Sequence, residues 1–98
     1  MGQQPKRRRF RNVVGKQIAS ARSARGLTQE AFAAKLQIAG LDGLEKTGIS
    51  KIEHQVRSVQ DYELHIIAHI LKVPIESLFP PLGETKDSLP DLKEGYQS

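Results

Sequence analysis

The sequence predicts a compact all-α domain, and three observations support this prediction. Aliphatic residues recur three or four positions apart through the middle of the chain, which is the spacing of helices with one buried face. Aromatic residues make up only 5% and there is no Trp, so the core must be aliphatic. Ninety-eight residues form one domain at most, and a chain of this size buries only about 60% of its unfolded surface, which favours local packing.

Composition excludes several classes of protein. The chain has no Cys, which excludes a disulfide framework and a thiolate zinc site and fits a reducing cytoplasm. No apolar run approaches the length of about 18 residues that marks a membrane-spanning helix. The basic start of the chain has no apolar segment behind it, so we do not expect a secretory signal. We therefore expect a cytoplasmic domain without cofactors and without a membrane partner.

Basic residues gather at the start of the chain. Eight of the fifteen lie in the first 25 positions, and the first acidic residue is Glu30. A nucleic-acid partner is the leading explanation for this asymmetry, because Lys and Arg side chains neutralise phosphates. Composition alone leaves a solvated tail as the alternative. Residues 1–11 show no hydrophobic periodicity, so we expect a disordered basic arm.

Two helices are expected after the arm. Asn12 can cap the first, and Gly26 ends it, as Gly commonly does just past a helix. Thr28 can cap the second, over residues 29–38, by accepting a hydrogen bond from a free backbone N–H group. The residues expected on the buried sides of these helices are Val14, Ile18, Ala21, Phe32, Ala33 and Leu36.

A loop separates the second helix from a third. The glycines of residues 39–43 indicate the loop, and Asp42 with Glu45 can form a capping box at its end. The third helix is expected over about residues 44–54, although Gly48 inside it costs roughly 1 kcal/mol relative to Ala.

The third helix has an apolar and a polar side. Ile49 and Ile52 stand three apart and are expected to point inward. The residues left to point elsewhere are Lys46, Thr47, Ser50 and Lys51. A short helix with such a polar and basic side can enter a DNA major groove.

Two more helices complete the predicted domain, and a tail follows. Residues 55–60 form a connector with Val59 turned inward, and Pro74 begins a short fifth helix that ends at Phe79. The fourth helix, over residues 61–71, is expected to bury Leu64, Ile67, Ala68 and Leu71. The tail has a net charge of −2 and only scattered apolar residues. We therefore expect a basic arm at 1–11, a folded domain at 12–80 and a loosely ordered tail at 81–98.

Taken in order, these residues resemble the lambdoid repressor and Cro type of helix-turn-helix domain, often called the XRE family. The resemblance runs from about Val14 to Phe79, about two thirds of the chain. It is carried by Ile18, Arg22 and residues 26–29, 32–36, 49–53, 61–64, 67–68, 71–73 and 78–79. It implies a compact five-helix repressor-like domain whose third helix enters the major groove of double-stranded DNA.

The resemblance also implies roles for individual residues. Gln29 matches a phosphate-binding position, and His54 matches a backbone-contact position just past the third helix. The positions that face base edges are matched by Lys46, Thr47, Gly48 and Lys51, and we count Ser50 with this polar side. Arg22 and Glu53 match a salt bridge between the first and third helices. The alternative is that Arg22 is one more solvent-facing basic residue.

The chain departs from the family pattern in two ways. The turn before the third helix is longer than the compact version by the whole of residues 39–42, which leaves the angle of that helix uncertain. Glu45 and Gly48 also stand where short polar side chains are more usual. Gly48 either permits a close backbone approach or weakens the contact with bases, and the sequence leaves both interpretations open.

Two further features have competing interpretations. The run containing Arg7, Arg8 and Arg9 can lie along phosphates, enter a minor groove or act as an unspecific electrostatic anchor, and we favour the unspecific anchor. A nuclear-import signal is a further interpretation that rests on composition only. His65 and His69 stand four apart on the fourth helix, a spacing that can share a metal. Without Cys or an obvious third ligand we favour surface histidines. No catalytic constellation can be placed, so we do not expect an enzyme.

The sequence thus predicts a bacterial or phage regulator, nucleoid-associated when bound, that recognises double-stranded DNA sequence-specifically. A homodimer on a palindromic operator is expected, because one helix contacts only a few base pairs. Ile75, Leu78 and Phe79 are the first candidates for its dimer surface, and the tail leucines are the second. The rival is an antitoxin-like or adaptor module that binds protein, with residues 82–98 as a possible contact for a protein partner.

Overall fold

Every regular element in residues 10–97, the range that the structure describes, is helical. The structure is a computed structural model. The elements are α1 (Gly15–Ala24), α2 (Gln29–Ile38), α3 (Lys46–Glu53), α4 (Asp61–Leu71), the 3₁₀ helix η1 (Ile75–Leu78), α5 (Leu82–Asp87) and α6 (Leu89–Gln97). The prediction of an all-α helix-turn-helix domain is confirmed. None of these helices combines the length and the apolar character that crossing a membrane requires.

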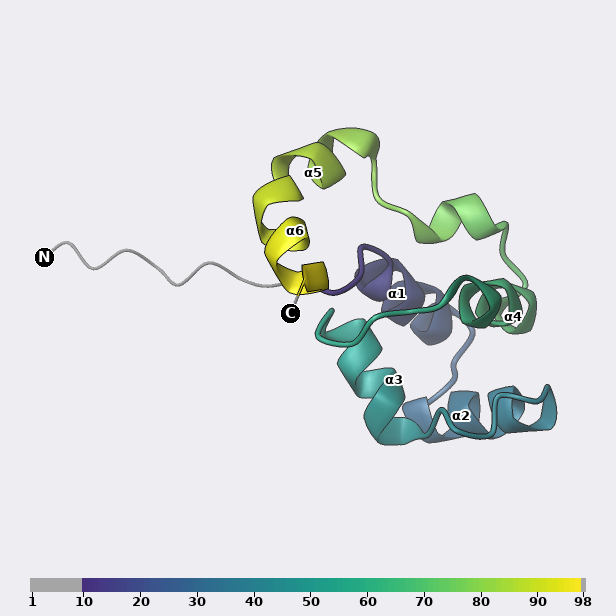
Figure 1. The fold of residues 1–98 in the computed structure, drawn as a ribbon. Coiled ribbons are helices and arrows are strands. Elements are labelled where there is room, and N and C mark those ends of the chain that lie inside the picture. Colours follow the sequence, from purple (N-terminus) through teal and green to yellow (C-terminus); the bar gives the residue numbers. More distant parts are fainter. Residues whose placement is uncertain (1–9, 98) are drawn as a thin grey trace, which may run out of the picture.

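The helices surround a core to which α1 to α4 and η1 all contribute. Figure 1 shows α2 and α3 along one side of the molecule, α1 and α4 next to them, and α5 with α6 at the other side. The third helix contacts both α1 and α2, and α4 contacts both α2 and η1. Helix α3 therefore packs directly against two helices of the core, whereas α5 and α6 lie at the other side of the molecule.

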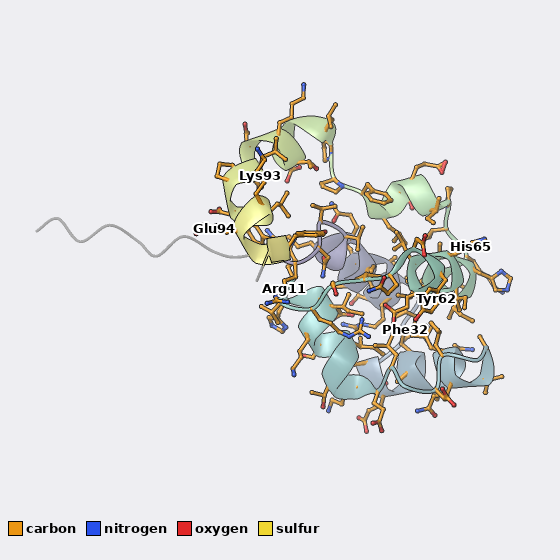
Figure 2. All side chains as sticks on the ribbon, viewed as in Figure 1. Arg11, Phe32, Tyr62, His65, Lys93 and Glu94 are labelled. Carbon is orange, nitrogen blue, oxygen red and sulfur yellow. The ribbon has the colours of Figure 1, made fainter. Side chains whose placement is uncertain are left out.

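The core is aliphatic, as the composition predicts, with one aromatic ring at its centre. Its most deeply buried side chains are Phe32, Ile18, Leu36, Ile49, Ile52, Ile67, Leu71 and Leu78. Ala21 and Val59 are only partly buried and pack against this cluster. Figure 2 shows Phe32 between α2 and α4, whereas His65 lies on the outer side of α4.

Local sequence patterns predicted the approximate bounds of two helices correctly. The second and fourth helices have the expected bounds. Thr28 caps α2, since its Oγ1 accepts a hydrogen bond of 3.0 Å from Ala31 N. Gly26 follows α1 with a φ of 69°, a left-handed conformation that Gly adopts at little cost. These predictions succeed because caps and stops involve residues close together in the chain.

Three helix starts differ from the prediction. The predicted capping box of Asp42 and Glu45 is wrong: Glu45 is itself the N-cap residue of α3, and its side chain makes no capping hydrogen bond. Asn12 is not the N-cap residue of α1, although its side chain does bind the backbone of the first turn. The fifth helix is a 3₁₀ helix that begins after Pro74, and Leu78 is its buried residue.

Where the sequence predicted a loosely ordered tail, the structure has two helices, α5 and α6. Leu92 is only 6% exposed, and buried Gly95 lies against the backbone of Phe10. The tail is ordered by contacts with the first described residues of the chain. A pattern of scattered leucines could not indicate this, because the partner lies more than 80 positions away.

Candidate nucleic-acid interface

The third helix presents one apolar and one polar side, as expected. Ile49 and Ile52 are fully buried, whereas Lys46 and Lys51 are exposed. Thr47 is exposed as well, and Gly48 and Ser50 are partly exposed. The Lys46 side chain keeps 60% of its surface accessible. The helix is thus held to the core by its isoleucines, and its basic side chains are exposed to solvent.

The long turn before α3 packs against α2 and the core. Leu41 N donates a hydrogen bond of 2.8 Å to Leu36 O, and Gly40 makes the necessary left-handed bend with a φ of 107°. Leu44 then inserts into the core and is 2% exposed. Because these contacts hold the turn, its extra residues leave the polar side of α3 uncovered.

Gly48 makes room for Leu44. A Cβ at Gly48 would come within 2.9 Å of Leu44 Cδ1, closer than real Cβ contacts. The glycine therefore lets the buried leucine of the turn pack beneath the first turn of α3. This contact gives Gly48 a packing role within the chain, and its part in any contact with bases stays a prediction.

Arg22 and Glu53 form the salt bridge between α1 and α3. Arg22 Nε donates to Glu53 Oε2 at 2.6 Å, and Arg22 Nη2 donates to Glu53 Oε1 at 3.0 Å. Their side chains are 16% and 6% exposed. The hydrogen bond to Glu53, with the negative charge of that carboxylate, raises the pKa of Arg22. Such a two-pronged contact fixes both direction and distance, so it sets the orientation of α3 relative to α1.

Gln29 joins the same network. Its Nε2 donates a hydrogen bond of 2.9 Å to Glu53 Oε1, while Arg22 Nη1 donates to Leu27 O at 2.7 Å. The amide predicted for a phosphate is thus bound to a carboxylate within the chain. One of its two N–H donors suffices for that bond. The start of α2 is therefore tied to α3.

Acidic residues near the polar side of α3 reduce its positive charge. Lys46 Nζ lies 3.8 Å from Glu30 Oε1, and both side chains are exposed. Glu45, at the N-cap of α3, is exposed as well. At the other end of α3, His54 Nδ1 lies 2.8 Å from Ser50 O, which orients the imidazole along the helix. An exposed pair such as Lys46 and Glu30 contributes about 1 kcal/mol at most, so a stronger ligand can displace it.

Asn12 has a larger role than helix capping. Its Oδ1 accepts hydrogen bonds from Val14 N and Gly15 N, and its Nδ2 donates to Ile52 O at 3.1 Å and to Arg57 O at 2.8 Å. One buried side chain therefore joins the start of α1 to the end of α3. The sequence could indicate a cap at this position, but its partners 40 and 45 residues away depend on the fold.

Arg57 and Glu63 form a third ion pair, which the sequence analysis missed. Arg57 Nη1 and Nη2 donate to the two carboxylate oxygens of Glu63 at 3.2 and 3.1 Å, and Gln60 N donates to Glu63 Oε1 at 2.9 Å. Burial alone raises the pKa of Glu63, but the hydrogen bonds from Arg57 and Gln60, with the charge of Arg57, outweigh it and lower the pKa. This pair holds the connector after α3 against the start of α4.

One solved structure has the same arrangement of helices. The crystal structure of the DNA-binding domain of BldD matches this chain with a TM-score of 0.61 and 22% sequence identity, over 72% of this chain and 94% of that domain. The chain has a helix-turn-helix fold. No family model and no curated protein sequence matches it. At this identity the likeness concerns the fold, and the roles of individual side chains come from their own geometry.

The remaining predicted residues divide into two groups. Arg7, Arg8 and Arg9 lie outside the described residues. His65 and His69 are exposed on α4, and within residues 10–97 no group of three or more His, Cys, Asp or Glu side chains could hold a metal ion.

Proposed function

We propose that this chain is a sequence-specific regulator of transcription that binds double-stranded DNA through α3. One observation carries the proposal: Lys46, Thr47 and Lys51 project from a helix whose opposite side is buried and whose direction is held by Arg22 and Glu53. Base recognition needs donors held rigidly on an element narrow enough for the major groove. The likeness in fold to the DNA-binding domain of BldD supports the same function.

In the proposed complex the two ends of the helix-turn-helix contact different parts of the duplex. Lys51 and Lys46 donate to base edges or to nearby phosphates, and Thr47 contacts a base or a thymine methyl group. The N-terminus of α2, with the second N–H donor of Gln29, receives a phosphate. Ser50 and His54 lie toward the DNA backbone at the end of α3. Gly48 adds only backbone surface.

The proposal includes the wider assignments that the sequence resemblance implies. The chain is of the lambdoid repressor type, acts in the cytoplasm of a bacterium or on behalf of a phage, and binds a palindromic operator as a two-fold dimer. Arg7, Arg8 and Arg9 add contacts to phosphates outside the central site. Such contacts strengthen binding to all sequences and increase its dependence on salt.

Selection from a random duplex pool at two salt concentrations tests this function. We expect recovery of one palindromic site whose binding persists at the higher salt concentration, because base contacts are less sensitive to salt than phosphate contacts. If all duplexes bind equally and the higher salt concentration abolishes binding, the chain binds DNA only through unspecific electrostatic contacts.

One observation keeps the rival function in view. Glu30 and Glu45 are exposed beside Lys46, and their charge opposes that of phosphates. A module that binds a protein instead of DNA, in the manner of an antitoxin or adaptor, would tolerate these carboxylates. The absence of any duplex from the selection would favour this rival.

A further inference from the structure

The end of α2 carries a large apolar side chain that the core does not use. Ile38, the last residue of the helix, is 88% exposed, and no other large apolar side chain in the described part of the chain is as exposed. Leu36, two residues earlier, is fully buried, so α2 is held to the core without Ile38. An apolar side chain left in water becomes informative when it belongs to a larger apolar patch.

Ile38 belongs to such a patch, because it borders an open hollow of about 520 Å³ between α2 and α4. A second hollow continues along α4, and His69 lines both of them. We call the two together the α2–α4 groove. Its apolar lining comes from Ile38, Ala39, Ile66, Ala68, Ile70 and Val73. The groove is thus an aliphatic surface with room for side chains from another molecule.

The charged and titratable side chains that line this groove are all of one kind. They are Lys35, His65, His69 and Lys72, and all four are exposed. The lining residues, which all lie in the described part of the chain, include no Asp or Glu. Within residues 10–97 no acidic side chain pairs with Lys35 or Lys72. Basic groups around an apolar groove complement carboxylates that flank an apolar stripe.

We propose that the α2–α4 groove binds an acidic amphipathic helix of another protein. The apolar side of that helix packs on Ile38 and Ile70, and its flanking carboxylates lie beside Lys35 and Lys72. A second copy of the chain does not fit, because a two-fold interface would bring each lysine toward the same positive patch of its partner. The chain's own acidic tail does not fit either, since α6 packs against Phe10 at the other side of the molecule.

The groove and the polar side of α3 lie at opposite ends of α2. Gln29, the first residue of α2, contacts Glu53 of α3, whereas Ile38, the last, borders the groove. Figure 1 likewise shows α3 at one end of α2 and α4 near the other. A helix in the groove therefore leaves Lys51 exposed. The inference goes beyond the proposed function, because it adds a protein-binding surface that stays available whether or not α3 holds DNA.

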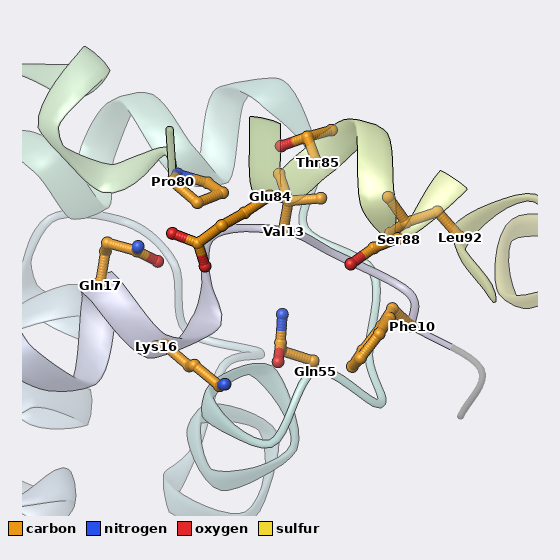
Figure 3. A pocket seen from close by; sticks show the side chains of 10 residues that line it. All are labelled: Phe10, Val13, Lys16, Gln17, Gln55, Pro80, Glu84, Thr85, Ser88 and Leu92. Carbon is orange, nitrogen blue, oxygen red and sulfur yellow. The ribbon is translucent and has the colours of Figure 1, made fainter. Parts of the chain in front are cut away.

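A cavity at the other side of the molecule lacks this one-sided charge. It lies between the start of α1 and α5 and has a volume of about 80 Å³, too small for a helix. Figure 3 shows Lys16 and Glu84 among its lining side chains, so both signs of charge are present. An acidic helix has no reason to prefer this region, and α5 therefore supplies control positions.

The test selects peptides on the full-length chain. The library holds amphipathic helices of about 18 residues, or about five turns, with random aliphatic side chains on one face and Lys or Glu in random order elsewhere. We expect the recovered peptides to carry more Glu than Lys beside the apolar stripe and to bind less tightly as the salt concentration rises. Ile38→Ser should weaken their binding about tenfold, because burial of the isoleucine is lost, and Lys35→Glu should weaken it about fivefold.

Two variants of α5 are the matched controls. Leu82→Ser removes a side chain that is 67% exposed, and Lys86→Glu changes the net charge by the same amount as Lys35→Glu. Both controls should bind the recovered peptides as the unaltered chain does. Circular dichroism should show all four variants folded, because each replaced side chain is exposed.

Three results would overturn the inference. The first is the recovery of peptides richer in Lys than in Glu, or of none. The second is an equal loss of binding in the variants of the groove and in the controls. The third is a dimer that Ile38→Ser converts to a monomer in sedimentation, because the occupant is then a second copy. The proposed function has a separate readout: if acidic peptides bind but no duplex is selected, only DNA recognition is lost.

Discussion

Gly15, the first residue of α1, lies against the carbonyl oxygen of Ile52 near the end of α3 so closely that no side chain fits between them. The start of the first helix and the end of the third are therefore in direct backbone contact. Asn12 bridges the same two segments. The orientation of the proposed DNA-binding helix thus depends on a buried glycine of another helix.

Replacing this glycine should disrupt the fold. Gly15→Ala forces a methyl group into the Ile52 carbonyl, so α1 and α3 must separate, and we expect a loss of about 3 kcal/mol in the free energy of unfolding. Gly43→Ala is the control, because its Cβ would meet no atom within 4 Å. Urea denaturation followed by circular dichroism measures both. Equal stability of the two variants would show that α3 is not held in this way.

Arg22→Ala should destabilise the chain far more than Arg25→Ala. It leaves the Glu53 carboxylate buried without its guanidinium, and breaking a buried pair costs about 3–5 kcal/mol. Because Arg22 keeps some contact with solvent, we expect the lower end of that range. Arg25 is exposed just after α1 and serves as the control. Chemical denaturation measures the stability of both variants. Similar midpoints would show that the pair of Arg22 and Glu53 does not stabilise the fold.

Lys51→Ala should change DNA recognition without changing stability. Its side chain is exposed, so the thermal midpoint should stay within about 4 °C of the unaltered chain, while loss of a base contact costs about 1–3 kcal/mol of discrimination. Lys35→Ala is the control, since Lys35 is equally cationic and exposed but lies near the end of α2 beside α4. Binding of both variants to the selected site and to a scrambled duplex provides the measurement. A large loss of stability in Lys51→Ala would give this lysine a structural role instead.

Glu63 should make the fold sensitive to acid. Its pKa lies below the ordinary value of 4.5 because the bonds from Arg57 and Gln60 outweigh burial. A carboxylate with a lowered pKa in the folded state stabilises fully above its unfolded pKa, and this stabilisation is lost as the pH falls through the folded pKa. Glu63→Gln should therefore flatten the fall in thermal midpoint below about pH 4.5, measured by circular dichroism.

Glu76→Gln is the matched control for this pH series, because Glu76 is an exposed carboxylate of η1. It should leave the acid limb of the stability profile as steep as in the unaltered chain. If Glu63→Gln leaves that limb unchanged as well, Arg57 and Glu63 do not couple the connector to α4.

The sequence by itself determined the helices of the first 79 residues and most of the core. Thr28 at the start of α2, Gly26 after α1, and the spacing of Ile49 with Ile52 all act within a few residues, so their effect is visible in a single stretch of chain. The polar side of α3 follows directly from that spacing. Arg22 and Glu53 could be paired only through the resemblance to a known family.

The tertiary structure alone decided how these helices are joined. Gln29 binds Glu53, Leu44 packs beneath Gly48, and Gly95 lies on Phe10, although none of these contacts leaves a periodic pattern. The order of the tail has the same origin, because Gly95 is buried against Phe10 at the opposite end of the chain. Helix formation depends on neighbours in sequence, whereas burial and backbone contact depend on neighbours in space, which only the folded chain brings together.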